Sequence, residues 1–207
     1  MCGRYNISKL QPFMAMHQWI EESVDWQPQY NAAPSQMLPV VTASRKIELF
    51  KWGLIPGWAD DPAVGNRMIN ARAETLTVKA AFKKLLATRR CIIPANGFYE
   101  WKKEGTHRMP YYIAQADGTP MAFAGLWDTW RGRAGVIHSF TIITTTSNAQ
   151  MARIHDRMPA ILPPEHYTQW LSRPMALEPY PADTLTARII TMKVNNPRHN
   201  SPDILDP

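Results

Sequence analysis

Proline recurs along the whole chain and limits how far any helix can run. The 207 residues include 18 prolines, about 9% of the chain where globular proteins average about 5%. Each proline lacks a main-chain N–H donor and interrupts the interior of a helix. The sequence therefore predicts many short elements joined by turns rather than a bundle of long helices.

Short runs of β-branched and aromatic residues supply the candidate strands. Residues 37–43 and 46–53 are expected to form a hairpin around Ser44 and Arg45. Further strand patterns, some separated by Glu-Gly and Asp-Gly turns, occur at 91–105, 109–119, 120–127, 138–146 and 188–193. Because most of these runs can pair locally, we predict an α+β fold around a curved, mostly antiparallel β-sheet or open barrel with short peripheral helices.

Helical patterns are few and short. Apolar residues recur at helical spacing in residues 8–20 and 74–90, and start signals favour short helices at 147–154 and 163–171, the former ending at His155. The end of the chain is polar and rich in proline. We expect residues 1–207 to form one domain, with a polar surface extension at about 193–207.

The composition excludes several classes of protein. The first ten residues hold no apolar segment of a secretory signal, and no run of 18 apolar residues predicts a membrane span. Cys2 and Cys91 give no disulfide framework and lack the spacing of zinc ligands, so we expect a cytoplasmic protein without a metal or cofactor. A net charge of +6 is compatible with nucleic-acid binding but does not establish it.

The chain opens MCGRY, which places Cys2 directly behind the initiator methionine. If Met1 is removed, Cys2 carries a thiol and a free α-amine on adjacent carbons. Such an amine has a reference pKa of about 7.7–8.0, so much of it is neutral near pH 7.5. The pair can condense with an aldehyde to form a five-membered thiazolidine, or attack an amide as N-terminal nucleophile hydrolases do. The structural alternative is an ordinary thiol near the start of a strand.

Three further stretches carry residues suited to chemistry. INARAET contains the amide of Asn70 and the forked cation of Arg72, although the same residues suit a helix-start loop. In GFYEWKKEG, alternation places Phe98 and Glu100 on one face of a strand and Tyr99 and Trp101 on the other. Burial between aromatic residues would raise the pKa of Glu100, whereas pairing with a surface lysine is the alternative.

IHDRMP and KWGLIPGW supply the remaining candidates. His155 is a candidate because histidine is in general suited to carrying protons, although a histidine beside an aspartate often has a structural role. Trp58 follows a Pro-Gly turn and is expected in a surface loop, where it either stacks on a base or packs beneath the loop.

These motifs resemble one family when they are taken together and in order. MCGRY, YNAAPS, WGLIPGW, INARAET, RRCIIPANGFYEW, FAGLW, FTIITT and IHDRMP resemble the SOS-response-associated peptidase (SRAP) family, from Met1 to about Pro163. The resemblance implies self-processing that removes Met1, followed by capture of the aldehyde of an abasic site in single-stranded DNA through Cys2, as a thiazolidine crosslink. A secondary abasic-site lyase activity is also implied.

The resemblance also implies roles for individual residues. Cys2 is the nucleophile, Asn70 positions it, and Glu100 and His155 handle protons. The implied DNA contacts are the phosphate-binding side chains Arg4, Arg72 and Arg157 and the nucleotide-stacking side chains Trp58 and Trp101. A monomer without an obligate protein partner, associated with the nucleoid when it acts on DNA, is expected.

Two other functions fit parts of the sequence. An N-terminal cysteine amidotransferase or other amide hydrolase also begins Met-Cys-Gly, but it would need a glutamine pocket and a partner synthase domain. A non-catalytic single-stranded DNA-binding module would not depend on Cys2.

Overall fold

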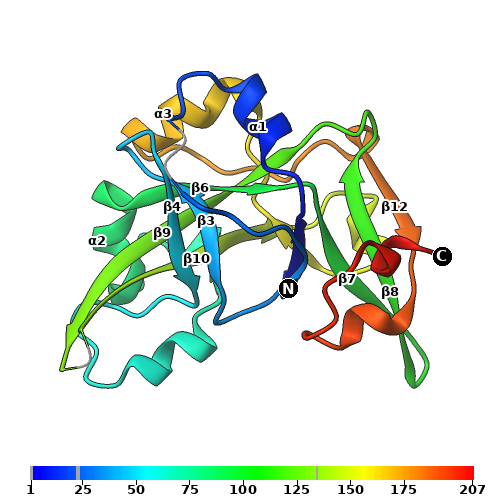
Figure 1. The fold of residues 1–207 in the computed structure, drawn as a ribbon, viewed down its shortest axis with the longest axis horizontal. Coiled ribbons are helices and arrows are strands. Elements are labelled where there is room, and N and C mark those ends of the chain that lie inside the picture. Colours follow the sequence, from blue (N-terminus) through cyan, green and yellow to red (C-terminus); the bar gives the residue numbers. More distant parts are fainter. Residues whose placement is uncertain (1, 22–23, 134) are drawn as a thin grey trace.

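Two β-sheets form the body of the protein in the computed structural model, which describes residues 2–21, 24–133 and 135–207 (Figure 1). The first sheet has the order β12-β8-β7-β1-β2 and is antiparallel throughout. Its strands are β1 (Arg4–Ile7), β2 (Gln29–Ala32), β7 (Gly97–Glu104), β8 (His107–Gln115) and β12 (Leu185–Ile189).

The second sheet closes on itself. Its order is β11-β10-β4-β3-β6-β9, and because β9 also pairs with β10, five of its strands form a ring. The ring strands are β3 (Met37–Val41), β4 (Ile47–Trp52), β6 (Arg90–Ala95), β9 (Met121–Gly132) and β10 (Gly135–Thr146). Two short strands, β5 (Asn70–Arg72) and β11 (Arg157–Pro159), flank β10. The predicted α+β class with a curved sheet and barrel is confirmed, and the barrel is closed rather than open.

Short helices cover the outside of the sheets. The α-helices are α1 (Gln11–Met16), α2 (Ala80–Thr88) and α3 (Tyr167–Ser172). Short 3-10 helices are η1 (Pro62–Arg67), η2 (Ala73–Thr75), η3 (Met151–Arg153), η4 (Pro164–His166), η5 (Ala182–Thr184), η6 (Met192–Asn195) and η7 (Pro202–Leu205). In the described residues no helix is long and apolar enough to cross a membrane.

The predicted hairpin is present, whereas one of the predicted helices is shorter than expected. Residues 37–41 and 47–52 pair as the predicted hairpin, and Arg45 in its turn has a φ of 62°, in the left-handed region. The helix predicted at 74–90 is shorter than expected, because its first six residues form η2 and a turn before α2 begins at Ala80.

The element before His155 is also shorter than predicted. Only the 3-10 turn η3 forms, and Asn148 Oδ1 rather than Ser147 accepts from the main-chain N–H of Met151. The last strand, β12, ends at Ile189, so residues 190–193 of the predicted strand lie outside it.

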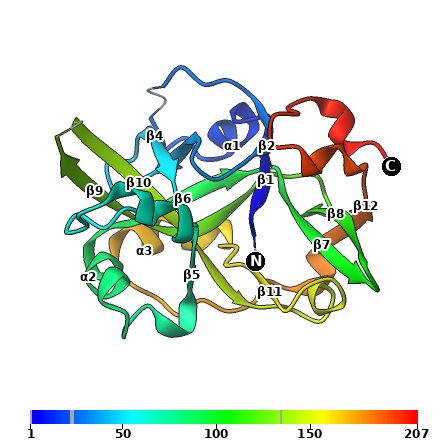
Figure 2. The same ribbon diagram turned by 90° about the horizontal axis from the view of Figure 1, so that it is seen from below.

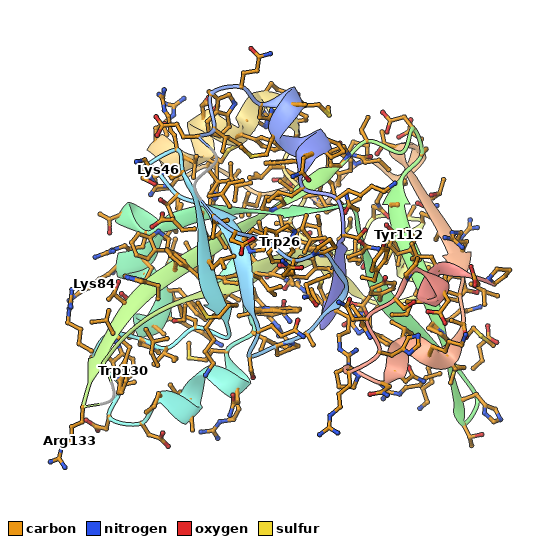
Figure 3. All side chains as sticks on the ribbon, in the orientation of Figure 1. Trp26, Lys46, Lys84, Tyr112, Trp130 and Arg133 are labelled. Atoms are coloured by element: carbon orange, nitrogen blue, oxygen red, sulfur yellow. The ribbon has the colours of Figure 1, made fainter. Side chains whose placement is uncertain are left out.

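The end of the chain belongs to the fold. Val194 and Ile204 are fully buried, and both pack with Tyr99 and Tyr112 in a small second core against the five-stranded sheet (Figure 3, where Tyr112 is labelled). The polar composition of residues 193–207 predicted a surface extension, and most of these residues are exposed. Val194 and Ile204 point into the second core, and the Asn200 side chain bonds to the main chain of Tyr30 and Asn31.

The start of β1 lies between the sheets. Tyr5 of β1 packs edge-to-face on Trp52 of the barrel and on Phe123 of β9, at centroid distances of 5.3 and 5.9 Å. In the view of Figure 2, β5, β7 and β11 surround the first residues of β1. Segments far apart in the sequence therefore meet near Cys2.

Candidate active site around Cys2

Cys2 is fully buried and is separated from the start of β1 by Gly3 alone. Strand β1 pairs with β7 through Arg4 opposite Tyr99, which brings the start of the chain alongside the residue after Tyr99. Burial, together with the negative charge of Glu100, raises the pKa of the Cys2 thiol well above its usual value. The thiol is therefore protonated and shielded from solvent in the 207-residue chain.

Asn70 holds the main chain of Cys2. It begins β5, which runs parallel to β10 with Asn70 opposite Ile142. Its Nδ2 donates a 2.9 Å hydrogen bond to the carbonyl oxygen of Cys2. Its Oδ1 is buried and has no hydrogen-bond partner among the described residues. The predicted proximity of Asn70 and Cys2 is present in the structure.

Glu100 lies on the face of β7 that points toward the main core. Phe98, on the same face, is in that core, whereas Tyr99 and Trp101 face the second core, as the alternation predicted. Only 2% of Glu100 is exposed. Burial raises the pKa of its carboxyl group, and the nearby charge of His155 opposes this shift. A carboxyl group with a raised pKa holds its proton to a higher pH than an exposed one, and it can exchange that proton with a neighbour.

His155 follows η3 and precedes β11. Its Nδ1 lies 2.8 Å from Asp156 Oδ1 and 3.0 Å from the main-chain nitrogen of Arg157. The first contact requires a proton on Nδ1 and the second requires a lone pair there, so the tautomer of the ring decides which of the two is made. Either contact orients the imidazole ring.

The predicted DNA contacts differ in their exposure. Trp58 is 70% exposed and Arg72 is exposed at the end of β5. Trp101 is half-buried, and its Nε1 donates to Asn195 Oδ1 at 2.7 Å. Arg4 is also half-buried, and its Nη1 donates to Asn31 Oδ1 and to the carbonyl oxygen of Val194, at 2.9 Å each.

Arg157 has a different position from the one predicted. Its side chain is 10% exposed, and its two terminal nitrogens bond to the carboxylate oxygens of Glu74 at 2.6 and 3.0 Å. The carbonyl oxygen of Thr144 accepts a further bond at 2.6 Å. Because these partners use the fork of the guanidinium group, we assign Arg157 to holding β11 and η2 against β10 and do not retain it as a phosphate contact.

Three residues near the site were not singled out by the sequence. Tyr5 is fully buried, and burial together with the Cys2 and Cys91 thiols raises the pKa of its hydroxyl group. Glu74 is the partner of Arg157, and Asn31 bonds to Arg4. Asn31 gave no usable signal, because the sequence did not predict the strand β2 in which it lies.

The fold and the site define a cysteine-centred protein in which the Asn70 amide bonds to residue 2, the Glu100 carboxyl group lies close enough to raise the pKa of the Cys2 thiol, and His155 lies near Glu100. Its described part contains no cluster of three potential metal ligands. Comparison with known families agrees with the motif order: a family model described as SOS response associated peptidase (SRAP) matches residues 1–197. The chain belongs to this family.

Relatives and solved structures span nearly the whole chain. The chain is 39% identical to the abasic site processing protein YoaM of Bacillus subtilis, over 100% of this chain and 98% of that protein. It is 29% identical to the abasic site processing protein YedK of Escherichia coli, with 100% of both chains covered. A crystal structure of a protein from Bacteroides thetaiotaomicron superimposes with a TM-score of 0.90 at 29% identity, covering 99% of this chain and 98% of that one.

Proposed function

We propose that this protein processes abasic sites in single-stranded DNA by covalent capture through Cys2. The observation that carries the proposal is the hydrogen bond from Asn70 to Cys2, made beside the buried carboxyl group of Glu100. Membership of the SRAP family and similarity to relatives named abasic site processing proteins support it.

The reactive form has lost Met1, which lies outside the described residues. Cleavage of the Met1–Cys2 peptide bond consumes one water and leaves the α-amine on Cys2. An amide carbonyl at residue 2 held by Asn70 keeps this terminus in one place when the amine is released. We propose that the removal is autocatalytic, with Cys2 as nucleophile and Glu100 transferring the proton.

Capture then follows from the functional groups present. A closed deoxyribose hemiacetal opens to its aldehyde when a group such as His155 moves a proton. The neutral Cys2 amine adds to the aldehyde carbon, and loss of one water gives an imine. The thiol sulfur then bonds to the same carbon while the imine nitrogen takes the thiol proton. The product is a thiazolidine, and the net change is the loss of one water.

Glu100 can act in both proton transfers of this sequence. Its raised pKa keeps a proton available to the departing hydroxyl group, and its carboxylate accepts a proton from the attacking amine. An imine that does not close permits β-elimination at the sugar, and we propose the resulting lyase activity as a secondary one. Arg4, Arg72, Trp58 and Trp101 are the proposed contacts to DNA.

The test is a denaturing gel with a single-stranded oligonucleotide that contains one abasic site. Wild-type protein should give a band that survives denaturant, and Cys2→Ala should give none. A wild-type protein that forms no such band would contradict the proposal. A band that persists in Cys2→Ala would show attachment through another residue, and hydrolysis of glutamine by Cys2 without a band would favour an amidotransferase.

A second measurement separates self-processing from removal by another enzyme. The intact mass of the wild type should lack Met1, whereas Glu100→Ala made in the same host should retain it. Equal loss of Met1 in both would exclude a role of Glu100 in autocatalysis.

A further inference from the structure

Asn31, in the YNAAPS segment, takes no part in the reaction proposed at Cys2. It lies in β2 and is fully buried. Its Nδ2 lies within hydrogen-bond distance of three carbonyl oxygens of the C-terminal segment: those of Val194 at 3.2 Å, Asn196 at 3.0 Å and His199 at 3.0 Å. Its Oδ1 accepts from Arg4 Nη1 at 2.9 Å. Both ends of this amide are therefore used.

A second asparagine fastens the same segment from the other side. Asn200 Oδ1 accepts from the main-chain N–H of Tyr30 at 2.6 Å and of Asn31 at 3.3 Å. Asn200 Nδ2 donates to the carbonyl oxygen of Pro28 at 3.1 Å. The C-terminal segment is short and polar. The side-chain hydrogen bonds of Asn31 and Asn200, together with the burial of Val194, therefore hold the segment against β2.

The fastened segment contacts two of the proposed DNA-binding residues. The carbonyl oxygen of Val194 accepts from Arg4 Nη1 at 2.9 Å, and Asn195 Oδ1 accepts from Trp101 Nε1 at 2.7 Å. Arg4 is two residues from Cys2, and Trp101 follows Glu100. The direction of both side chains at the edge of the site therefore depends on where residues 194–195 lie.

We propose that Asn31 is a positioning residue for the DNA strand that carries the lesion. It fixes residues 194–199, and through them Arg4 and Trp101, without touching the reacting atoms. The inference rests on the proposed function, because it assumes that Arg4 and Trp101 contact DNA. Under this proposal, the C-terminal segment also belongs to the DNA-binding surface beside Cys2, together with Asn31 and Asn195.

Two substitutions test the amide directly. Asn31→Asp is nearly the same size but replaces two donors with an acceptor that faces three carbonyl oxygens, and Asn31→Ala removes both ends. The exposed Asn200→Ala is a milder second variant that removes only the outer fastening, in case either Asn31 variant fails to fold. The matched control is Gln27→Ala, which removes another exposed amide just before β2.

The readouts separate positioning from chemistry. The concentration of undamaged single-stranded oligonucleotide that gives half-maximal fluorescence anisotropy measures DNA binding. The rate at which Cys2 condenses with a small aldehyde, without DNA, measures the aminothiol itself. Hydrogen exchange of residues 193–205 measures the fastening.

We expect the Asn31 variants to reach half-maximal anisotropy at an oligonucleotide concentration about tenfold higher than the wild type. This is the loss of affinity typical of removing a charge-assisted hydrogen bond. Asn200→Ala should show a smaller increase, and all three variants should exchange faster at residues 193–205. Their rates with the small aldehyde should stay within about twofold of the wild type, because Cys2 is not in contact with Asn31. Gln27→Ala should match the wild type in every readout.

An unchanged DNA affinity in variants whose C-terminal segment exchanges faster would overturn the positioning role. An equal loss of the small-aldehyde reaction would also overturn it, because Asn31 would then act on the chemistry. Failure of the proposed function has a different signature. The wild type would then bind undamaged DNA without forming a crosslink to an abasic site, and the effect of the Asn31 variants on binding would still decide the positioning role.

Discussion

Asn70 and Cys2 are 68 residues apart in the chain and are joined by a 2.9 Å hydrogen bond from Asn70 Nδ2 to the Cys2 carbonyl oxygen. Parallel pairing of β5 with β10 places the amide at this point. The bond holds the main chain of residue 2 rather than its thiol. It therefore fixes the main chain from which the Cys2 side chain and, after the proposed loss of Met1, its amine extend.

Asn70→Ala should slow capture without weakening DNA binding. Loss of one hydrogen bond of about 1.4 kcal/mol corresponds to about a tenfold lower rate of crosslinking. The measurement is the single-turnover rate with a saturating abasic oligonucleotide, followed on a denaturing gel. Asn66→Ala, an exposed asparagine four residues earlier, is the control and should react at the wild-type rate. A wild-type rate in Asn70→Ala would remove the positioning role from Asn70.

Glu100→Gln should make the folded state more stable at neutral pH. Burial raises the pKa of this carboxyl group in the folded protein. A carboxyl group whose folded pKa lies above its unfolded pKa contributes stability below the unfolded value, and that stability is lost as the pH rises through the folded pKa. The difference in the free energy of unfolding between Glu100→Gln and the wild type should therefore grow between pH 4 and pH 7.

Urea denaturation at several pH values measures this difference. The control is Glu104→Gln, on the same strand, because the Glu104 side chain is 49% exposed and pairs with Lys102 at the surface. It should change the pH dependence little. A Glu100→Gln variant that is less stable than the wild type at pH 7 would contradict the effect of burial on Glu100.

Arg157→Met should destabilise the protein by about 2 kcal/mol, since it leaves Glu74 and the Thr144 carbonyl oxygen without their charged donor. The value is modest for an ion pair because Glu74 is half-exposed. The bond from Arg157 lowers the pKa of Glu74, so the stability from this pair is present at neutral pH and is lost as the pH falls through the folded pKa. Thermal unfolding at pH 7 and pH 4 checks both points.

A phosphate contact would give the opposite pattern for Arg157. The affinity for DNA would then fall in Arg157→Met while the stability stayed at the wild-type level. Arg72→Met is the matched comparison, because Arg72 is exposed at the end of β5. It should weaken DNA binding and reduce its salt dependence with little effect on stability.

Trp58→Ala should weaken single-stranded DNA binding and leave the fold intact. The indole ring is 70% exposed, so its removal costs little packing. Stacking on a base contributes about 1–3 kcal/mol, which corresponds to roughly a five- to 150-fold change in affinity. Fluorescence anisotropy with an undamaged oligonucleotide measures the change, and Val78→Ala, at another exposed apolar position, serves as the control. Equal affinities for both variants would remove Trp58 from the DNA-binding surface.

Local patterns predicted much of the fold. Turn residues and alternation gave the hairpin of β3 and β4 and the two faces of β7, because both depend on neighbours in the sequence. The parallel pairings of β10 with β4 and β5 join distant segments, and no local signal predicts them. The positions of Arg157 and of the C-terminal segment likewise depend on partners, Glu74 and Asn31, that only the folded chain provides.

The candidate site was likewise predictable only in part. The types of residue at positions 2, 70, 100 and 155 indicated their chemistry, and the motif order indicated the family. Only the fold shows that the Asn70 amide reaches the Cys2 carbonyl and that Glu100 is nearly free of solvent contact.

The intact mass of the covalent adduct tests the central claim most directly. Wild-type protein is incubated with a single-stranded oligonucleotide that carries one abasic site, and the product is weighed under denaturing conditions. The account predicts the mass of the protein without Met1, plus that of the oligonucleotide, less one water, with the attachment on Cys2. An adduct that retains Met1, an attachment at another residue, or no adduct would contradict it.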